Sequence, residues 1–311
     1  MKYISVRFVC RMQTRGSFSA YKGSMLRGSL GASLRRAVCM TQKTECCRCM
    51  LCGTCIFPRL FTAASAPKGS DTAPQLPPPF CIEPSRDRQT EYAAGDSFSF
   101  ALKLFSYATD YLPYFIHAFT LAGQHGMGRG TEQGQGRFCI EDVLQSETSV
   151  YDAREERLHD VAAQELPLPE PCPAGPEGQV ICRFVTPLRF KAANRLSTTL
   201  DFATLMRLII RRIKSLCALD DVAFRLPPKD FTALIRTASS VRVEENALRW
   251  EDWNRYSGRQ QTVMQLGGLT GHIVYQGPVT VFARYLDFAS RVHIGKQSSF
   301  GLGALVLDNL S

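Results

Sequence analysis

An acidic, proline-rich stretch near the middle of the chain, residues 152–178, limits how this sequence can fold. It ends in LPLPEPCPAGPEG, and proline disfavours both helix interiors and central strands. The 311 residues are enough for two domains of ordinary size. We therefore predict a first domain over residues 1–151, a linker over residues 152–178 and a second domain over residues 179–311.

The two halves share one order of hydrophobic patterns. Residues 2–10 alternate as a strand does, and residues 24–39 carry apolar side chains every four positions, which is typical of a helix. The same order returns at residues 180–190 and 201–218. Further strands are predicted at 96–105, 136–143, near 240–250, 268–276 and 304–308, and further helices at 110–126 and 278–289. Two βαββαβ-like halves indicate an α+β protein of tandem ferredoxin-like (RRM-like) domains.

Positive charge is concentrated near the N-terminus. Residues 1–60 hold eleven Lys and Arg against the single acid Glu45, whereas residues 141–170 hold nine acids against Arg154 and Arg157. A basic face attracts polyanions, most often nucleic acid, although an ordinary solvated surface can have the same composition. No apolar run approaches the roughly 18 residues of a membrane span, and residues 1–13 lack a signal-peptide pattern. We therefore expect a cytoplasmic protein with no membrane partner.

Two glycine-rich segments are candidates for anion binding, GMGRG at residues 126–130 and HIGKQSSFGLG at residues 293–303. Glycine tolerates positive φ, so peptide N–H groups can converge on a phosphate oxygen. The second loop is not a P-loop, because Ser290 and Gln297 stand where that motif needs Gly and Ser or Thr. The first is not a dinucleotide fingerprint, because Thr131 replaces its last glycine. Neither loop indicates a nucleotide cofactor.

Four segments together resemble one known family. They are GSMLRGSLGASLRRAVC at 23–39, DYLPYFIHAFTLAGQHGMGRGTEQGQGRF at 110–138, WEDWNRYSGRQQTVMQLGGLTGHIVYQG at 250–277 and HIGKQSSFGLG at 293–303. In this order they resemble the RAMP superfamily, specifically the CRISPR-associated endoribonuclease that cuts precursor CRISPR RNA. The C-terminal glycine loop is the most specific of the four. The residues TEQGQ lengthen the first glycine loop relative to the family pattern.

The resemblance implies two RRM-like halves, with RNA along the cleft and the basic faces, and cleavage of CRISPR repeat RNA without a metal ion. A ribose 2′-OH would attack its own 3′-phosphate, leaving a 2′,3′-cyclic phosphate and a 5′-OH. The enzyme then needs a base for that hydroxyl, an acid for the 5′-oxygen and cations for the charged transition state. The implied partners are repeat RNA, the processed crRNA and CRISPR effector subunits.

Histidine suits both proton roles because its ordinary pKa is about 6.5. His293 adjoins the C-terminal glycine loop and is the first candidate for general acid or base, with Lys296 as the neighbouring cation. The alternative is that His293 ends a strand and bonds backbone. His125, beside the first glycine loop, is the second candidate. The remaining histidines are weaker candidates: His117, expected in the core because its helix is apolar, His159 and His272.

The C-terminal loop is also expected to hold RNA, through Gly295, Ser298, Ser299, Gly301 and Gly303. The segment WNRYSGRQ at 253–260 interleaves aromatic and basic residues, a mixture that stacks bases and pairs phosphates. The alternative there is core tryptophans beside surface arginines. The further RNA-binding candidates are Arg129, Arg255, Tyr256 and Arg259. A helical face that either grips RNA backbone or is simply solvated carries Arg207, Arg211 and Lys214.

Six of the twelve cysteines lie in the segment 39–55, within a Cys-rich insertion predicted at 39–58. The spacing of Cys39, Cys46, Cys49 and Cys55 is similar to that of the subfamily. Four thiolates close in sequence suit a structural tetrahedral zinc ion, and an iron–sulfur cluster uses the same ligands. Disulfides are disfavoured in a reducing cytosol. The neighbouring thiols that could replace Cys46 or Cys49 are Cys47 and Cys52.

Two other functions remain open at this point. A non-catalytic RAMP subunit that binds guide RNA in an effector complex would use the same folds and glycine loops. A zinc-dependent nucleic-acid module of unrelated fold would lose binding on chelation, because its first domain would unfold. Cleavage of repeat RNA in the presence of EDTA separates the endoribonuclease from both.

Overall fold

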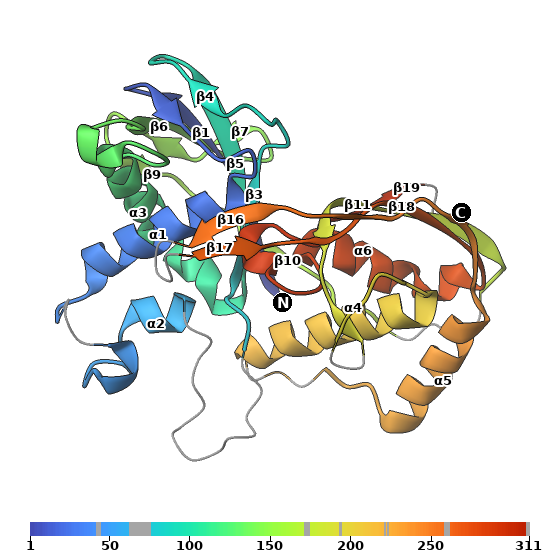
Figure 1. The fold of residues 1–311 in the computed structure, drawn as a ribbon. Coiled ribbons are helices and arrows are strands. Elements are labelled where there is room, and N and C mark those ends of the chain that lie inside the picture. The colour runs from blue at the N-terminus through green and yellow to red at the C-terminus, as the bar shows by residue number, and fades with distance from the viewer. Residues whose placement is uncertain are drawn as a thin grey trace. The chain divides into compact units, whose positions relative to one another are not determined.

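The computed structural model describes residues 1–41, 45–61, 76–170, 175–192, 195–220, 222, 224–257 and 262–308, with the backbone alone at 192, 195, 254–257 and 262–265. The chain divides into two compact units, Lys2–Glu165 and Leu166–Ser311, and Met1 groups with the second (Figure 1). In the described part of the chain, no helix is both long enough and apolar enough to cross a membrane.

The first unit has the order βαββαβ predicted from the sequence. Its central strand β1 pairs with β5 on one side and β6 on the other, and β3 lies beside β5. All these pairs are antiparallel, and the strand order β3-β5-β1-β6 is that of a ferredoxin-like fold. The elements are β1 (Lys2–Met12), α1 (Gly23–Val38), β3 (Phe80–Pro84), β5 (Ser97–Phe105), α3 (Leu112–His125) and β6 (Phe138–Gln145).

Aromatic side chains fill the core between this sheet and its helices. Alternate residues of β1, including Val6, Phe8 and Cys10, are buried, as the period of a strand requires. Phe8 stacks on Phe100 of β5 with ring centroids 4.8 Å apart, and Phe119 of α3 lies 4.6 Å from Phe100. Buried aromatic rings remove large apolar areas from water, so they hold α3 on the sheet.

The second unit repeats the topology of the first. Its strand order is β14-β18-β11-β19, and every pair is antiparallel. The corresponding elements are β11 (Gly178–Leu188), α4 (Phe202–Cys217), β14 (Arg242–Asn246), β18 (Gly268–Gly277), α6 (Ala283–Val292) and β19 (Leu305–Asp308). The predicted tandem ferredoxin-like architecture is therefore confirmed, and the Cys-rich segment lies in the first unit.

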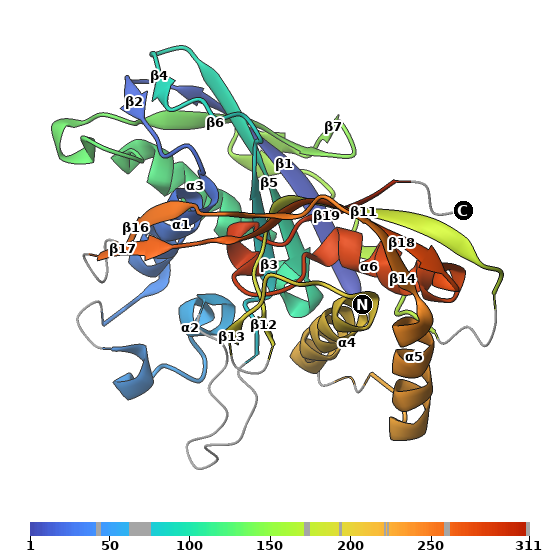
Figure 2. The ribbon, with the colours of Figure 1, turned by 45° about the vertical axis from the view of Figure 1, so that its right-hand side comes forward.

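Several elements add to this common plan. An extra helix, α5, packs on α4 (Figure 2), and β16 pairs with β17 as a hairpin. The additional helices are α2 (Ile56–Phe61) and α5 (Pro228–Ser240), with 3₁₀ turns η1 (Cys46–Arg48), η2 (Ser106–Tyr111), η3 (Thr131–Gln133), η4 (Ala218–Asp220), η5 (Val279–Phe282) and η6 (Ser298–Phe300). The additional strands are β2 (Gly16–Ser17), β4 (Glu91–Tyr92), β7 (Thr148–Ser149), β8 (Tyr151–Asp152), β9 (Arg157–Leu158), β10 (Gln164–Glu165), β12 (Lys191–Ala192), β13 (Arg195–Leu196), β15 (Arg249–Glu251), β16 (Asn254–Ser257) and β17 (Thr262–Gln265).

The predicted linker differs from the structure in its first half. The division between the units falls after Glu165, inside the predicted 152–178 stretch. Residues before it are ordered in the first unit: β8 pairs with β9, and β10 pairs with β1 through Lys2 and Glu165. These strands are two residues long, too short for the alternation that identifies a strand in sequence.

A buried lysine sits at the start of α1. The Lys22 side chain is 1% exposed, and its ammonium donates to the Asp87 carboxylate at 2.7 Å and to the Asp87 carbonyl at 3.3 Å. It also lies 5.6 Å from the ring centroid of Tyr92. Partial burial would raise the pKa of Asp87, but hydrogen bonds from Lys22 and Ser85 and the Lys22 charge lower it to about 2.

We expect Asp87→Asn to destabilise the protein by about 1–3 kcal/mol, because it leaves a buried ammonium without its anion. The folded-state pKa of Asp87 lies below its ordinary value of 3.8. The stabilisation is therefore complete above about pH 4 and disappears as the pH falls towards 2. Urea unfolding followed by circular dichroism measures both effects.

The matched control is Glu141→Gln, which removes the partner of the half-exposed Arg11. Such surface pairs contribute about 0–1 kcal/mol. Equal destabilisation by the two substitutions at neutral pH would contradict the role of the buried pair.

Candidate functional site

The two glycine loops, 126–136 and 293–303, have the same backbone conformation. Both contain eleven residues, and positive φ recurs at five corresponding positions. In the first loop these are Gly126 (87°), Gly128 (88°), Gly130 (75°), Gly134 (75°) and Gly136 (73°); in the second they are His293 (54°), Gly295 (86°), Gln297 (62°), Gly301 (87°) and Gly303 (73°). The first loop follows α3 and the second follows α6, and each contains one 3₁₀ turn, η3 or η6.

Each loop is closed by a hydrogen bond across its ends. Met127 N–H donates to the Gly136 carbonyl at 2.9 Å, and Ile294 N–H donates to the Gly303 carbonyl at 3.1 Å. A Cβ at Gly136 would lie 1.9 Å from the Met127 carbonyl oxygen. A Cβ at Gly303 would lie 1.8 Å from the Ile294 carbonyl oxygen. Only glycine fits such an approach, so these two positions are fixed by backbone packing.

Several loop N–H groups bond inward instead of converging on an anion. Lys296 N–H donates to the Arg189 carbonyl at 2.7 Å, and Gly303 N–H donates to the Pro187 carbonyl at 3.1 Å. In the first loop, Arg129 N–H donates to the Ser17 carbonyl at 3.0 Å, and Gly136 N–H donates to that of Arg15 at 2.8 Å. These bonds tie each loop to the end of the central strand of its sheet or to the residues just after that strand. The predicted cradle of amides is thus largely used by the fold itself.

The ring of His293 is buried, which argues against its predicted catalytic role. The residue is 1% exposed, and Nδ1 lies 3.1 Å from the Leu302 carbonyl oxygen. A general base must reach the substrate hydroxyl, and a ring enclosed by the protein does not. The alternative reading, a histidine that bonds backbone at the end of an element, agrees with this position. The helix α6 ends directly before it, at Val292.

The exposed residues of the loops are their cations. Lys296 and Arg129 occupy corresponding positions, both with exposed side chains. The predicted RNA-binding serines Ser298 and Ser299 are 8% and 5% exposed, and Gly301 and Gly303 are buried as well. Side-chain contact with a phosphate is therefore open to Lys296 and Arg129, while the serines and glycines shape the loop behind them.

His125 and His117 are both exposed. His125 ends α3, and its Nδ1 lies 2.7 Å from the Leu121 carbonyl oxygen, which leaves Nε2 for a substrate proton. The core position predicted for His117 is wrong: an apolar helix in a two-layer unit still has an outer face, and His117 lies on it. His272 pairs with Glu245 at 3.0 Å.

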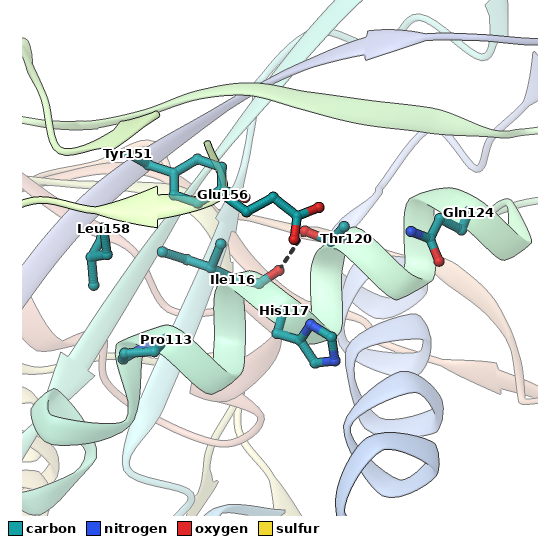
Figure 3. A pocket seen from close by; sticks show the side chains of 8 residues that line it. All are labelled: Pro113, Ile116, His117, Thr120, Gln124, Tyr151, Glu156 and Leu158. Carbon is teal, nitrogen blue, oxygen red and sulfur yellow. Dashed lines mark hydrogen bonds between the residues drawn. The ribbon is translucent and has the colours of Figure 1, made fainter. Parts of the chain in front are cut away.

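His117 borders a small hollow outside α3, with a volume of about 180 Å³. Figure 3 shows the Glu156 side chain extending from the β8–β9 turn towards Thr120, above Ile116. The lining side chains carry one carboxylate and no Lys or Arg; they are Pro113, Ile116, His117, Thr120, Gln124, Tyr151, Glu156 and Leu158. Burial and the Glu156 charge raise the pKa of the Tyr151 phenol. This electrostatic character does not suit a phosphodiester.

Three arginines on the central strands of the two sheets are paired with acids. In the first unit Arg7 pairs with Glu147 and Arg11 with Glu141. In the second, Arg183 pairs with Asp308 at 2.9 Å. These pairs neutralise three arginines that would otherwise attract a polyanion to the sheets. Two of the other predicted RNA-binding residues, Arg255 and Tyr256, belong to strand β16, of which the structure describes the backbone. Arg259 lies outside the described residues.

The thiols of the Cys-rich segment lie near one another. Thr41 Oγ1 is 3.8 Å from Cys39 Sγ and 3.7 Å from Cys49 Sγ. Burial raises the pKa of the Cys46 thiol, Arg35 lowers it, and the neighbouring thiols Cys39, Cys52 and Cys55 raise it further. Cys47 is exposed. Within the described residues, no three potential ligands are assembled as a metal site.

Known proteins share both the sequence pattern and the fold. Residues 182–305 match the family model described as CRISPR-associated endoribonuclease Cas6, and residues 1–163 match one described as an N-terminal domain. No curated protein matches the chain.

Two solved structures of similar length resemble the whole chain. A Cas6 product complex has a TM-score of 0.58 at 16% identity, covering 99% of this chain and 100% of that chain. Thermus thermophilus Cas6 has a TM-score of 0.53 at 14% identity, covering 99% of this chain and 98% of that chain. At these identities the structures show a shared fold.

A larger assembly contains a similar chain. A partial Cas6-RT-Cas1–Cas2 complex has a TM-score of 0.55 at 14% identity, covering 100% of this chain and 46% of that chain. The present fold thus corresponds to about half of that longer protein.

We expect Gly136→Ala to destabilise the protein more than Gly134→Ala. Both residues have φ near +75°, which costs an alanine about 1–2 kcal/mol. A Cβ at Gly134 meets nothing within 4 Å, whereas at Gly136 it overlaps the Met127 carbonyl. That overlap should add about 1–3 kcal/mol. Equal urea midpoints for the two variants would contradict the close approach of the loop ends.

Proposed function

The chain belongs to the Cas6 family of CRISPR-associated endoribonucleases, and on this premise we propose that it cuts the repeat RNA of precursor CRISPR transcripts without a metal ion at the scissile phosphate. The family places the enzyme in CRISPR RNA processing. The observation that carries the finer proposal is the C-terminal glycine loop, which ends the matched region and presents the exposed Lys296.

The chemistry can be balanced with groups of the RNA and the protein alone. A base takes the proton of the ribose 2′-OH, and the 2′-oxygen forms a bond to its own 3′-phosphorus. The bond from phosphorus to the 5′-oxygen breaks, and an acid protonates that oxygen. The products are a 2′,3′-cyclic phosphate and a 5′-OH. Cations near the phosphate stabilise the charge that builds up on its oxygens.

His125 is the candidate for proton transfer that remains accessible. Its Nδ1 is held by the Leu121 carbonyl, so a neutral ring keeps Nε2 as an acceptor for the 2′-OH proton. Lys296 and Arg129 supply exposed positive charge from the two glycine loops. In this assignment His293 holds the C-terminal loop together through Leu302 and takes no proton from the substrate.

Incubation of the purified protein with repeat RNA in EDTA tests the proposal. We expect cleavage that leaves a 2′,3′-cyclic phosphate, and none when the scissile ribose lacks its 2′-OH. His125→Ala should lower the single-turnover rate about 10²–10⁴-fold, because proton transfer contributes that much. RNA binding should be unchanged, and His159→Ala is the matched control.

Wild-type rates for His125→Ala would exclude His125 as the proton carrier. Tight binding of repeat RNA without any cleavage would instead indicate a non-catalytic RNA-binding RAMP subunit. We further propose that the processed crRNA stays bound as the product and that CRISPR effector subunits are additional partners. The enzyme would act in the cytoplasm, where precursor transcripts are made.

We also propose a structural zinc ion, or an iron–sulfur cluster, at the Cys-rich segment. Thiolate ligands suit either group, and the contacts through Thr41 bring Cys39 and Cys49 near each other. Cys46 and Cys55 would complete four ligands, with Cys52 close enough to substitute. The group would fix the end of α1 to the segment before α2 and would take no part in cleavage.

The double substitution Cys39→Ser/Cys55→Ser should remove the metal and lower the urea midpoint, because metal binding free energy contributes to folding. Elemental analysis of the purified chain measures metal per chain, and visible absorption separates an iron–sulfur cluster from zinc. Cys139→Ser on β6 is the control. Stability that is equal with and without chelator would contradict the site.

A further inference from the structure

We infer that the exposed face of α4, formed by Arg207, Arg211 and Lys214, binds the phosphate backbone of the RNA substrate away from the cut. This face is called the α4 stripe below. The inference rests on the proposed function for the identity of the polyanion. It adds a binding surface to the helical layer of the second unit.

The stripe follows from how α4 is buried. The helix begins after Asp201, whose side chain accepts from Thr204 N–H at 2.7 Å. Its apolar residues, including Leu205, Ile209 and Ile213, face the core. The stripe residues lie on the opposite face and are exposed. Their spacing of four and then three residues places them in one row.

The charge of this row is uncompensated. No acidic residue occurs between Phe202 and Cys217, and no carboxylate of a described residue forms an ion pair with a stripe residue. Lys214 lies 5.5 Å from the ring centroid of Phe231 on α5, a contact that orients the ammonium without neutralising it. The remaining cation of the helix, Arg212, is buried and donates to the Val292 carbonyl at 3.0 Å.

Three other exposed cations of the same unit are paired with acids. Arg291 pairs with Asp287 at 3.3 Å, Arg284 with Glu170 at 3.6 Å and Arg183 with Asp308 at 2.9 Å. Like charges four residues apart destabilise a helix by about 0.2–0.5 kcal/mol. A row that accepts this cost, on a helix that has no acidic residue of its own, is suited to an external polyanion.

The dimensions fit a nucleic-acid backbone. Seven residues of α-helix rise about 10 Å from Arg207 to Lys214. A strand of B-DNA carries one phosphate per about 3.4 Å of axis, and at a spacing of this order the stripe can meet about three successive phosphates. Such contacts add affinity through the release of counterions and carry no sequence information. The stripe would therefore strengthen binding of repeat RNA without selecting the cut.

The test uses repeat RNA with a 2′-deoxy scissile ribose, which blocks cleavage, and the full-length protein. Its affinity is measured by fluorescence anisotropy over a range of salt concentrations. The stripe variant is Arg207→Ala/Arg211→Ala/Lys214→Ala. The control variant, Arg183→Ala/Arg284→Ala/Arg291→Ala, removes three paired cations from the same unit and has the same net charge.

We expect the stripe variant to reduce the slope of log K against log salt by about 2 to 3, because each lost phosphate contact removes about 0.7 on a single strand and about 0.9 on a duplex. The control should change it by less than half as much. Equal effects of the two variants, or wild-type affinity of the stripe variant, would overturn the inference. Circular dichroism verifies folding, and Arg207→Gln/Arg211→Gln replaces the stripe variant if α4 unfolds.

Failure of the inference and failure of the proposed function give different results. If the wild type cleaves repeat RNA and the stripe variant binds it normally, the stripe is excluded while the function stands. If the wild type binds without cleaving and the stripe variant binds weakly, the stripe stands and the enzyme assignment fails. If the α4 stripe binds an acidic protein instead of RNA, the first result is expected: the wild type cleaves repeat RNA and the stripe variant binds it normally.

Discussion

The close approach of backbone to backbone in the glycine loops is the constraint on which the candidate site depends. At Gly136 and Gly303 a carbonyl oxygen lies where a side chain would begin, 1.9 Å and 1.8 Å from an ideal Cβ. The loops can therefore fold back on themselves, and each is tied by further hydrogen bonds to the end of a central strand. The backbone path fixed by these contacts determines where the Lys296 and Arg129 side chains lie. A glycine-rich sequence here gives precise placement more than flexibility.

The two units share one topology, so their candidate site residues can be compared position by position. Both have the strand order of a ferredoxin-like fold and the same eleven-residue loop after the second helix. The residues TEQGQ, predicted to lengthen the first loop, lie within it at positions 131–135, and the two loops are equal in length. The histidines near the loops differ in exposure: His293, at the start of the second loop, is buried, whereas His125, just before the first loop, is exposed.

The distribution of ion pairs separates surfaces that can attract RNA from those that cannot. Arg7, Arg11 and Arg183 on the sheets are each paired with an acid. An RRM-like unit offers its open sheet as one surface for single-stranded RNA, but the charges of these three arginines are neutralised by their partners. Uncompensated charge remains on the loops and on α4. For this molecule the helical layer is the more favourable surface for a phosphate backbone.

The sequence by itself determined the α+β class, the tandem order of elements and the position of both glycine loops. These properties depend on local periodicity and on backbone conformations that only glycine adopts readily. It did not reveal α5, whose buried positions are Leu234, Ile235 and Ala238 alone, nor the two-residue strands before Glu165. Such short or sparsely apolar elements are stabilised by their neighbours and leave a weak periodic pattern.

Only the tertiary structure decided which candidate residues are accessible. The spacing of His293 and Lys296 is local, but burial depends on what packs over each side chain. The fold covers His293 and leaves Lys296 in solvent. Likewise, the partners of Arg7 and Arg11 lie 140 and 130 residues away. Periodicity tells which face of an element a residue occupies, whereas long-range contacts decide what meets that face, and these contacts exist only in the folded chain.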